Sequence, residues 1–454
     1  MLSRLRSAVV PAYLFACLII GGSAQGIWGN MLLQLAGVAM IAWAALDRGD
    51  GELSSATRHL LLLAALTLAV VLLQLVPLPS NLWVEIGPRS RIADGFAALG
   101  IPVPPEPISL TPAKTLDSIL GFIPPLAIFC AMVRLKAYRP QWLAVALVAG
   151  TILGIALGAL QVAGSSSDTP AWYLYEETNV GKAVGFFANA DHMATLLIIT
   201  IPFLVAIVAA SKTAGVQRYS AAVAIAAGTA LVIVVGLVLN GSLAGYGLTV
   251  PVLAASVLII LPAQSRWRYW VLAATGLLLI GAVVGLETTS IGAGKLGEHA
   301  TSSVESRAQI LATTTRAIGD FMPFGSGLGS FRNVYPLYEQ PQQVAITYVI
   351  HAHNEYAEVA LELGLAGILL MLVFFAWWLS AVWRVWRTAE GGPFARAAAI
   401  ASGAILVHSV VDFPLRTAAI SVCFAMCLAL LADSRAAPPK EKRELRRRRH
   451  VEFR

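Results

Sequence analysis

Residues 349–383 read VIHAHNEYAEVALELGLAGILLMLVFFAWWLSAVW. Two histidines, an asparagine and three glutamates come first, and a long run without any charged residue follows them. A run of about 20 apolar residues is long enough to cross the hydrocarbon core of a bilayer as a helix. The stretch therefore predicts a membrane helix that begins with a dense group of ionisable side chains.

The rest of the 454-residue chain has the same apolar character. Hydrophobic residues make up 57% of it and charged residues only 13%, whereas soluble domains average about 45–50% and about 25%. We therefore predict an all-α, polytopic membrane protein with about twelve transmembrane helices. The expected spans are 8–25, 27–46, 59–77, 118–134, 142–164, 192–210, 219–239, 243–262, 269–287, 355–383, 395–411 and 415–432.

Basic residues are distributed unevenly between the two sides of this topology. With the N-terminus inside, 23 of the 32 Lys and Arg residues fall in inner segments, and 17 of the 25 acidic residues fall in outer ones. Segments rich in Lys and Arg stay in the cytoplasm, so we expect both termini to be cytoplasmic. The basic tail 434–454 is expected to lie near the anionic lipid of the bilayer, and we expect no nucleic-acid partner.

The four cysteines, Cys17, Cys130, Cys423 and Cys427, all lie within apolar runs. Their spacing is not typical of a metal site. We expect them to behave as small buried hydrophobic residues, with no disulfide and no metal.

Three outer loops are long, at 78–117, 165–191 and 288–354, and long loops are where functional residues tend to gather. The first is rich in proline, and we expect an extended cover without chemistry. The third contains an expected helix at 303–320, which lies on the membrane surface or against the bundle. Its apolar stripe would consist of Val304, Ala308, Leu311, Thr315 and Ile318.

Two arginines of this expected helix face different ways. Arg307 and Arg316 are nine residues apart, which is about half a turn in net angle. Arg307 falls within about 20° of Ile318 on a helical wheel, so a permanent cation is predicted near the buried face. Such a cation either extends to solvent, pairs with a structural carboxylate or binds an anionic ligand.

The segment after this helix combines glycines with polar and aromatic residues. Gly325, Gly327 and Gly329 follow a helix and not a strand, so they do not meet the requirement of a dinucleotide fingerprint. We interpret them as a flexible turn. Arg332, which follows them, either contacts a sugar or packs within the loop.

The acids of the opening stretch have partly structural explanations. Asn354 is a good helix N-cap, and Glu355 and Glu358 suit the positive end of the helix dipole. Glu362 lies two turns into the helix, and the sequence does not explain it.

His351 and His353 precede the cap. In an extended chain, residues two apart point in opposite directions, so we expect only one ring to face a site. A zinc pair would lack a third ligand.

Two further polar groups fall on the same expected outer side. GFFANADHMATLL (185–197) places Asn189, Asp191 and His192 at the start of the sixth span. HSVVDFPLR (408–416) places His408, Asp412 and Arg416 four residues apart. His408 and Asp412 either form an internal i, i+4 hydrogen bond or serve function, because polar groups at membrane depth are costly.

Taken in order, these segments resemble the O-antigen ligase/polymerase family. The likeness is carried by SRAQI (306–310), DFMPFGSGLGSFRNVYPLYE (320–339) and HAHNEYAEVALELGLAGILL (351–370), together with the two segments quoted above. It implies helices and loops at 1–184, a ligase-like domain at 185–433 and the tail at 434–454. It also implies a GT-C-like fold with a large periplasmic loop between helices 9 and 10.

The resemblance further implies a membrane glycosyltransferase of the bacterial inner membrane with a periplasmic active face. The donor would be a glycan on undecaprenyl pyrophosphate, and the acceptor would be lipid A–core for a ligase or another lipid-linked glycan for a polymerase. No cofactor and no divalent metal are implied. A lipid-linked sugar transporter is the alternative from another class, but transporters carry repeats and polar groups at mid-membrane.

The same resemblance assigns roles to residues of this chain. His353 matches the family's histidine before asparagine and would act as base, with His351 second, because an imidazole exchanges protons near neutral pH. Arg307 matches an arginine that would bind the pyrophosphate. Substrate contacts would come from Asn189, His192, Arg332, Asn354, Asp412 and Arg416.

One position departs from the family pattern. The family often carries arginine after the seventh span, whereas this chain reads NGSLAGYG with Leu243 at that place. Pyrophosphate binding would then need another cation, from Lys182, Arg332 or Arg416.

Overall fold

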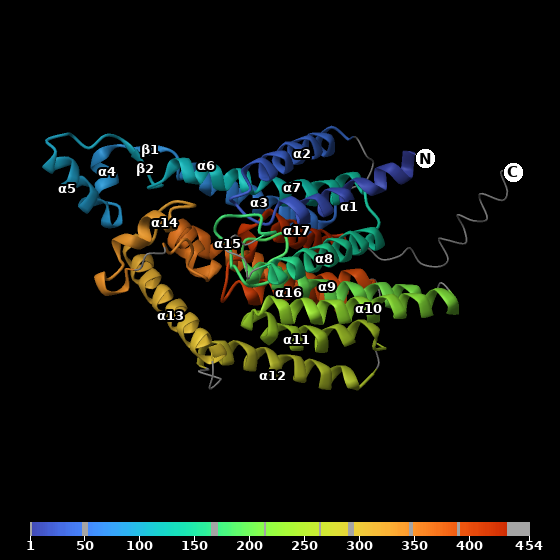
Figure 1. Cartoon of the computed structure of the whole chain (residues 1–454). Helices are drawn as coiled ribbons and strands as arrows, with labels where there is room; N and C mark the ends of the chain where they lie inside the picture. Colours follow the sequence, from blue (N-terminus) through green and yellow to red (C-terminus); the bar gives the residue numbers. More distant parts are fainter. Residues whose placement is uncertain are drawn as a thin grey trace.

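The computed structural model describes residues 2–47, 53–164, 171–212, 215–262, 265–288, 295–344, 348–387 and 391–433. The basic tail 434–454 lies outside them. The described chain is mostly helical (Figure 1). Its helices are α1 (Leu2–Ile20), α2 (Ile27–Leu46), α3 (Ser55–Leu73), α4 (Ser80–Val84), α5 (Ser90–Ala98), α6 (Pro112–Gly121), α7 (Ile123–Cys130), α8 (Pro140–Ala163), α9 (Ala190–Ser211), α10 (Val216–Asn240), α11 (Leu243–Ile260), α12 (Trp267–Thr288), α13 (Lys295–Phe321), α14 (Phe331–Val334), α15 (Glu355–Arg387), α16 (Pro393–His408) and α17 (Ala418–Ala432).

Short elements complete the chain. The strands β1 (Pro77–Leu78) and β2 (Glu106–Pro107) form one antiparallel pair. Single turns of 3₁₀-helix are η1 (Gly87–Arg89), η3 (Tyr335–Leu337), η4 (Pro341–Gln343) and η5 (Pro414–Arg416), and η2 (Ala131–Leu135) is a short π-helix.

Eight helical segments in the described ranges are long and apolar enough to cross a membrane. They are α2, α3, the segment Pro112–Leu135, α8, α9, α10, α11 and α15. Four shorter apolar helices lie at Arg6–Ile20, Trp267–Gly281, Pro393–His408 and Ala418–Ala432. The chain is thus an all-α polytopic membrane protein. Each predicted span overlaps one of these segments, but the count of twelve membrane crossings stays a prediction.

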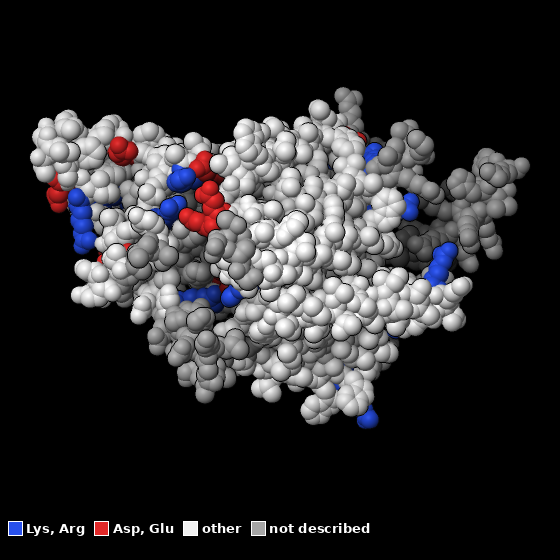
Figure 2. Space-filling model, in the orientation of Figure 1, with Lys and Arg blue, Asp and Glu red and all other residues white. Residues whose placement is uncertain are grey.

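Charged side chains avoid the middle of the bundle. On the face shown in Figure 2, Lys, Arg, Asp and Glu gather toward the two ends of the long helices, and the surface between them is almost free of charge. An uncharged belt of this kind is what a bilayer requires, because charge is costly in its hydrocarbon core.

Helix α9 lies at the centre of the bundle. In the most apolar stretch of α9, 72% of the residues are buried, against 22% in that of α10. Helix α9 packs against α8, α10, α11 and α16. Its first residues therefore sit among several helix ends, which places Asp191 and His192 where groups from other segments can reach them.

Small residues allow α8 to approach its neighbours closely. Gly150, Gly154 and Gly158 recur every four residues along one side of α8. A Cβ added at Gly150 would lie 2.6 Å from the Leu18 side chain of α1, and one at Gly158 would lie 2.8 Å from Ala183. Such small-residue stripes bring membrane helices into van der Waals contact where the hydrophobic effect between them is weak.

The expected helix at 303–320 exists as α13, but its predicted apolar stripe is correct only at Ile318, which packs against the buried cluster, and the side chain of Val304 lies outside the described residues. Ala308, Leu311 and Thr315 are exposed. The buried side is formed instead by Ile310, Thr313, Thr314, Ala317 and Phe321. Threonine is compatible with this face because its hydroxyl can bond the preceding turn; that of Thr314 donates to the Ile310 carbonyl at 2.7 Å.

The glycine segment after α13 is a tightly packed turn, so its interpretation as a flexible turn is wrong. Gly364 adopts φ 59° and ψ −145° and interrupts α15. The interruption leaves the carbonyls of Leu361 and Glu362 free to accept from the N–H groups of Ser326 and Gly327, both at 2.9 Å. The turn is therefore fastened to α15 backbone to backbone.

The first outer loop joins this arrangement through Arg89, which is fully buried. Arg89 donates to the Ile86 carbonyl at 2.8 Å and to the Gly325 carbonyl at 3.2 Å, and its guanidinium lies 5.7 Å from the centre of the Phe321 ring. Burial lowers the pKa of Arg89 to about 10. The loop is thus more than the extended cover that we expected, because it anchors the segment that holds α13 to α15.

Replacing Gly364 by alanine should destabilise the protein. A Cβ at this position would lie 2.2 Å from the Pro323 carbonyl oxygen in a backbone conformation that L residues rarely adopt, so we expect a loss of roughly 2 kcal/mol or more. Thermal unfolding in detergent would measure it. Gly228→Ala on α10, where a Cβ meets no atom within 4 Å, is the matched control and should be neutral; equal stability of both variants would contradict the prediction.

Candidate active site

The site begins at the N-terminus of α15. Asn354 caps the helix as predicted, because its side-chain oxygen accepts the N–H of Ala357 at 3.0 Å. His353 before it has a φ of 49°, and this left-handed residue turns the chain. The expectation that the two histidine rings point in opposite directions is therefore wrong: the rings of His351 and His353 both contact Phe413, at centroid distances of 4.2 and 5.1 Å.

His353 is held by a buried carboxylate. Its Nδ1 lies 3.1 Å from Oδ1 of Asp412, which is completely buried, while 28% of the His353 side chain is exposed. Burial alone would raise the pKa of Asp412, but the hydrogen bond from His353 and the nearby imidazole of His192 outweigh it and hold that pKa below its usual range. An ionised Asp412 fixes the proton of His353 on Nδ1 and leaves Nε2 free to accept another.

Two further histidines stand behind Asp412. His192 of α9 is buried, and its Nε2 lies 3.6 Å from the second carboxylate oxygen of Asp412. His408 does not form the predicted side-chain bond with Asp412; its Nδ1 pairs with the hydroxyl of Thr195 at 2.8 Å. The i, i+4 bond between the two residues runs through the backbone, since the Asp412 N–H donates to the His408 carbonyl at 3.0 Å. Both buried rings support the site from inside and offer little surface to a ligand.

A second histidine–carboxylate pair also lies beside Phe413. Nδ1 of His351 lies 2.9 Å from Oε1 of Glu358, and 26% of the His351 side chain is exposed. The guanidinium of Arg416 reaches the same oxygen at 2.9 Å and also lies 3.3 Å from Glu362. This contact explains Glu362, which the sequence left without a role.

The three glutamates of α15 are all buried, and Glu355 and Glu358 lie in its first turn as predicted. Glu355 accepts the N–H of Leu415 at 2.7 Å, Glu358 accepts that of Ala352 at 3.1 Å and Glu362 accepts that of Phe331 at 3.3 Å. Each carboxylate thereby fastens a different neighbouring segment to α15.

Arg307 of α13 meets an acid of α9. It lies 2.8 Å from Oδ2 of Asp191, and the other oxygen of Asp191 accepts the hydroxyl of Ser242, the N-cap of α11. Asp191 and Arg307 lie within electrostatic range of His408. The structural-carboxylate alternative for Arg307 is thus realised, although a guanidinium with five donors keeps others for a ligand.

Two residues that were predicted to contact substrate have other surroundings in the structure: Asn189 caps a helix, and Arg332 lies apart from the histidines. Asn189 caps α9 by accepting the N–H of Asp191 at 2.8 Å. Arg332 is exposed and its guanidinium lies 6.0 Å from the centre of the Tyr348 ring; it contacts none of the histidines or acids described above.

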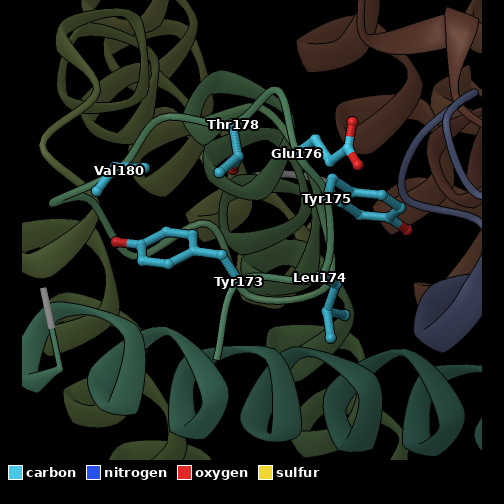
Figure 3. A pocket seen from close by; sticks show the side chains of 6 residues that line it. All are labelled: Tyr173, Leu174, Tyr175, Glu176, Thr178 and Val180. Atoms are coloured by element: carbon cyan, nitrogen blue, oxygen red, sulfur yellow. The ribbon is translucent and has the colours of Figure 1, made fainter. Parts of the chain in front are cut away.

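The segment before α9 carries a pocket of about 290 Å³, lined by Tyr173, Leu174, Tyr175, Glu176, Thr178 and Val180 (Figure 3). The rings of Tyr173 and Tyr175 point in opposite directions (Figure 3), so they do not form a pair of faces for one sugar ring. The Tyr173 hydroxyl is also engaged, since it accepts the Gly181 N–H at 2.8 Å. None of the predicted site residues lines this pocket.

Within the described residues, no group of three or more His, Cys, Asp or Glu side chains has the geometry to hold a metal ion. The four cysteines are free thiols, three of them buried.

The comparison with protein families bears directly on this arrangement. The O-antigen ligase family matches residues 228–372, which include α11, Arg307 and the histidine segment. Residues 228–372 thus match an O-antigen ligase domain, which is about a third of the chain. The match supports assignment to the O-antigen ligase/polymerase family, and it lies within the ligase-like part predicted at 185–433, whose boundaries stay a prediction. No curated protein matches the chain.

The candidate site contains partners that the sequence did not reveal. Phe413 lies inside the quoted segment HSVVDFPLR, but no spacing rule indicates that it would contact two histidines. Asp191 and Glu358 were visible as polar residues near helix starts; their pairing with Arg307 and His351 depends on which helix ends meet in space.

Arg416→Gln should destabilise the protein strongly. The change leaves Glu358 and Glu362, which are 1% and 0% exposed, without their cation, and breaking a buried pair costs roughly 3–5 kcal/mol. Arg218→Gln, at an exposed position of α10, is the control and should lie within about 0.5 kcal/mol of wild type. Thermal unfolding of both variants in the same detergent measures the difference, and equal midpoints would show that the network contributes nothing.

Proposed function

We propose that this protein transfers a glycan from undecaprenyl pyrophosphate to an acceptor hydroxyl at the periplasmic face of the bacterial inner membrane. The family match supports a membrane glycosyltransferase role in polysaccharide biosynthesis, with a lipid-linked glycan donor and a glycan acceptor. The observation that carries the proposal is the His353–Asp412 pair, which offers a free imidazole nitrogen at the end of an apolar bundle.

In the proposed reaction, the acceptor hydroxyl attacks the anomeric carbon of the donor. Nε2 of His353 takes the hydroxyl proton, and Asp412 stabilises the imidazolium that forms. The bond between the anomeric carbon and the pyrophosphate oxygen breaks, and Arg307 stabilises the departing pyrophosphate with the donors that Asp191 leaves free.

The remaining predicted residues take graded roles in this proposal. Asp412 and His192 are buried and position His353, so we now assign them no direct contact with substrate. Asn354 and Asn189 hold the starts of α15 and α9 beside the reacting groups, and Arg416 keeps the His351 side in place. Arg332 stays a candidate for contact with a distant part of the glycan.

The distribution of charge favours an enzyme over a transporter. Transporters bind their cargo near the bilayer midplane with broken helices and polar groups at that depth. Here the buried acids and histidines gather at the start of α9, the start of α15 and the α16–α17 connection. A glycan in contact with them would stay at the membrane surface.

The proposed roles of His353 and Arg307 can be tested on the surface glycan of the host. In a strain that lacks the gene, complementation with His353→Ala or Arg307→Ala should fail to restore it, because the base or the pyrophosphate contact is lost. His59→Ala, at an exposed position of α3, should complement fully. Glycan gels would separate a ligase defect, with long chains not attached to lipid A–core, from a polymerase defect, with a single capped repeat. Full rescue by both site variants would refute the assignment of these residues.

The proposed role of Asp412 in positioning His353 can be tested by a substitution that removes its charge. Asp412→Asn should lower kcat by roughly 10²–10⁴ with little change in KM, since the amide no longer enforces the reactive tautomer of His353. Asp117→Asn, at an exposed position of α6 where Asp117 pairs with Lys114, provides the control. Transfer assays with purified protein and host lipid-linked glycan would measure both. A rise in KM at unchanged kcat would instead indicate that Asp412 binds substrate.

A further inference from the structure

The two histidines of the site that are partly exposed, His351 and His353, each pair with a buried carboxylate. The proposed function uses only one of these pairs, that of His353, as the base. Each ring has Nδ1 against a buried carboxylate, at 3.1 Å for His353 and 2.9 Å for His351. Neither Nε2 atom has a hydrogen-bond partner among the described residues, and both side chains are about a quarter exposed. Each histidine is thus set to exchange a proton with something outside the protein.

The spacing of the two rings suits a pair that acts on one bond. Both contact Phe413, so their centroids lie within about 9 Å of each other, a separation at which an acid and a base can flank one glycosidic bond. Their Nδ1 atoms bond different carboxylates, those of Glu358 and Asp412, so each ring would exchange its own proton with the reactants or with water.

The surroundings of the two pairs differ in charge. Around His351, Arg416 lies 2.9 Å from Oε1 of Glu358, the same oxygen that bonds the ring. Around His353, the carboxylate of Asp412 is approached by the imidazoles of His192 and His408. The base of the proposed function is His353, which leaves His351 as the second exposed imidazole of the site.

We infer that His351 is the general acid of the proposed transfer, with His353 as the base. This inference rests on the proposed function. The acceptor oxygen bonds to the anomeric carbon, and its proton moves to Nε2 of His353. The bond from the anomeric carbon to the pyrophosphate oxygen breaks with its electron pair on that oxygen, which takes the proton from Nε2 of His351. One proton enters the protein and one leaves it, and exchange with water resets both rings.

Other ionisable and charged groups lie around the two rings and contribute to the pH dependence of the rate. They come from every element packed around the rings: Asp191 and His192 of α9, Arg307 of α13, Glu355, Glu358 and Glu362 of α15, His408 of α16, and Asp412 and Arg416 of the connection after it.

The experiment measures glycan transfer by the full chain in nanodiscs between pH 5 and 9, with undecaprenyl-pyrophosphate-linked glycan extracted from the host as probe. Wild type should show a rate that rises and then falls with pH. His351→Gln should lower kcat about 10²-fold and lose the falling limb, whereas His353→Gln should lose the rising limb. His59→Gln on α3 should reproduce the wild-type profile. A His351→Gln variant that keeps both limbs, or that changes only KM, would overturn the inference.

A second measurement needs no variant and so does not depend on folding of the mutants. In single-turnover transfer by wild type in mixtures of H2O and D2O, two protons in flight give a curved dependence of the rate on deuterium fraction. A straight line indicates one proton and excludes His351 as the acid. If wild type transfers no glycan at all, the proposed function itself fails; transfer with a straight line refutes the acid assignment alone.

Discussion

The guanidinium of Arg416 is the interaction on which the site depends. It lies 2.9 Å from Glu358 and 3.3 Å from Glu362, and these acids would be very costly to bury next to apolar helices without a cation. Glu358 also bonds His351, and Glu362 also accepts the N–H of Phe331. The contact with Arg416 therefore holds both of these segments. The connection between α16 and α17 is thereby held against the start of α15. Since Asp412 lies in that connection, its approach to His353 follows from the same attachment.

Backbone geometry supplies the second condition. His353 at φ 49° and Gly364 at φ 59° stand at either end of the first three turns of α15. The first turns both histidine rings toward Phe413, and the second exposes the carbonyls that receive the glycine turn and the Gln74 side chain, which donates to the Glu362 carbonyl at 2.9 Å. The start of α15, which carries the three glutamates, is consequently held by contacts from several segments. Such contacts are needed when reactive groups must keep a fixed geometry.

The sequence predicted much of the fold because hydrophobic runs and caps are local signals. The apolar segments and the Asn354 cap could be read from neighbouring residues alone. The face of α13 was missed because Thr313 and Thr314 look polar in sequence, whereas the Thr314 hydroxyl donates to the Ile310 carbonyl and that of Thr313 accepts from Arg316. In the same way, the sequence predicted which segments contribute to the candidate site but not the pairs within it. Asp412 with His353, and Glu358 with His351 and Arg416, depend on the meeting of helix ends, and φ at His353 has no signal in residue type.

The arrangement around Asp191 bears on Leu243, where the family often carries arginine. Leu243 begins α11 directly after Ser242, whose hydroxyl bonds one oxygen of Asp191, and Arg307 bonds the other oxygen at 2.8 Å. The guanidinium of Arg307 is therefore carried to the start of α11, close to the position that lacks its cation. The amino end of α11 adds the positive end of a helix dipole at the same place. In the proposed reaction, positive charge from α13 and from the α11 backbone would act together on the departing pyrophosphate, so an arginine at position 243 is not the only way to supply it.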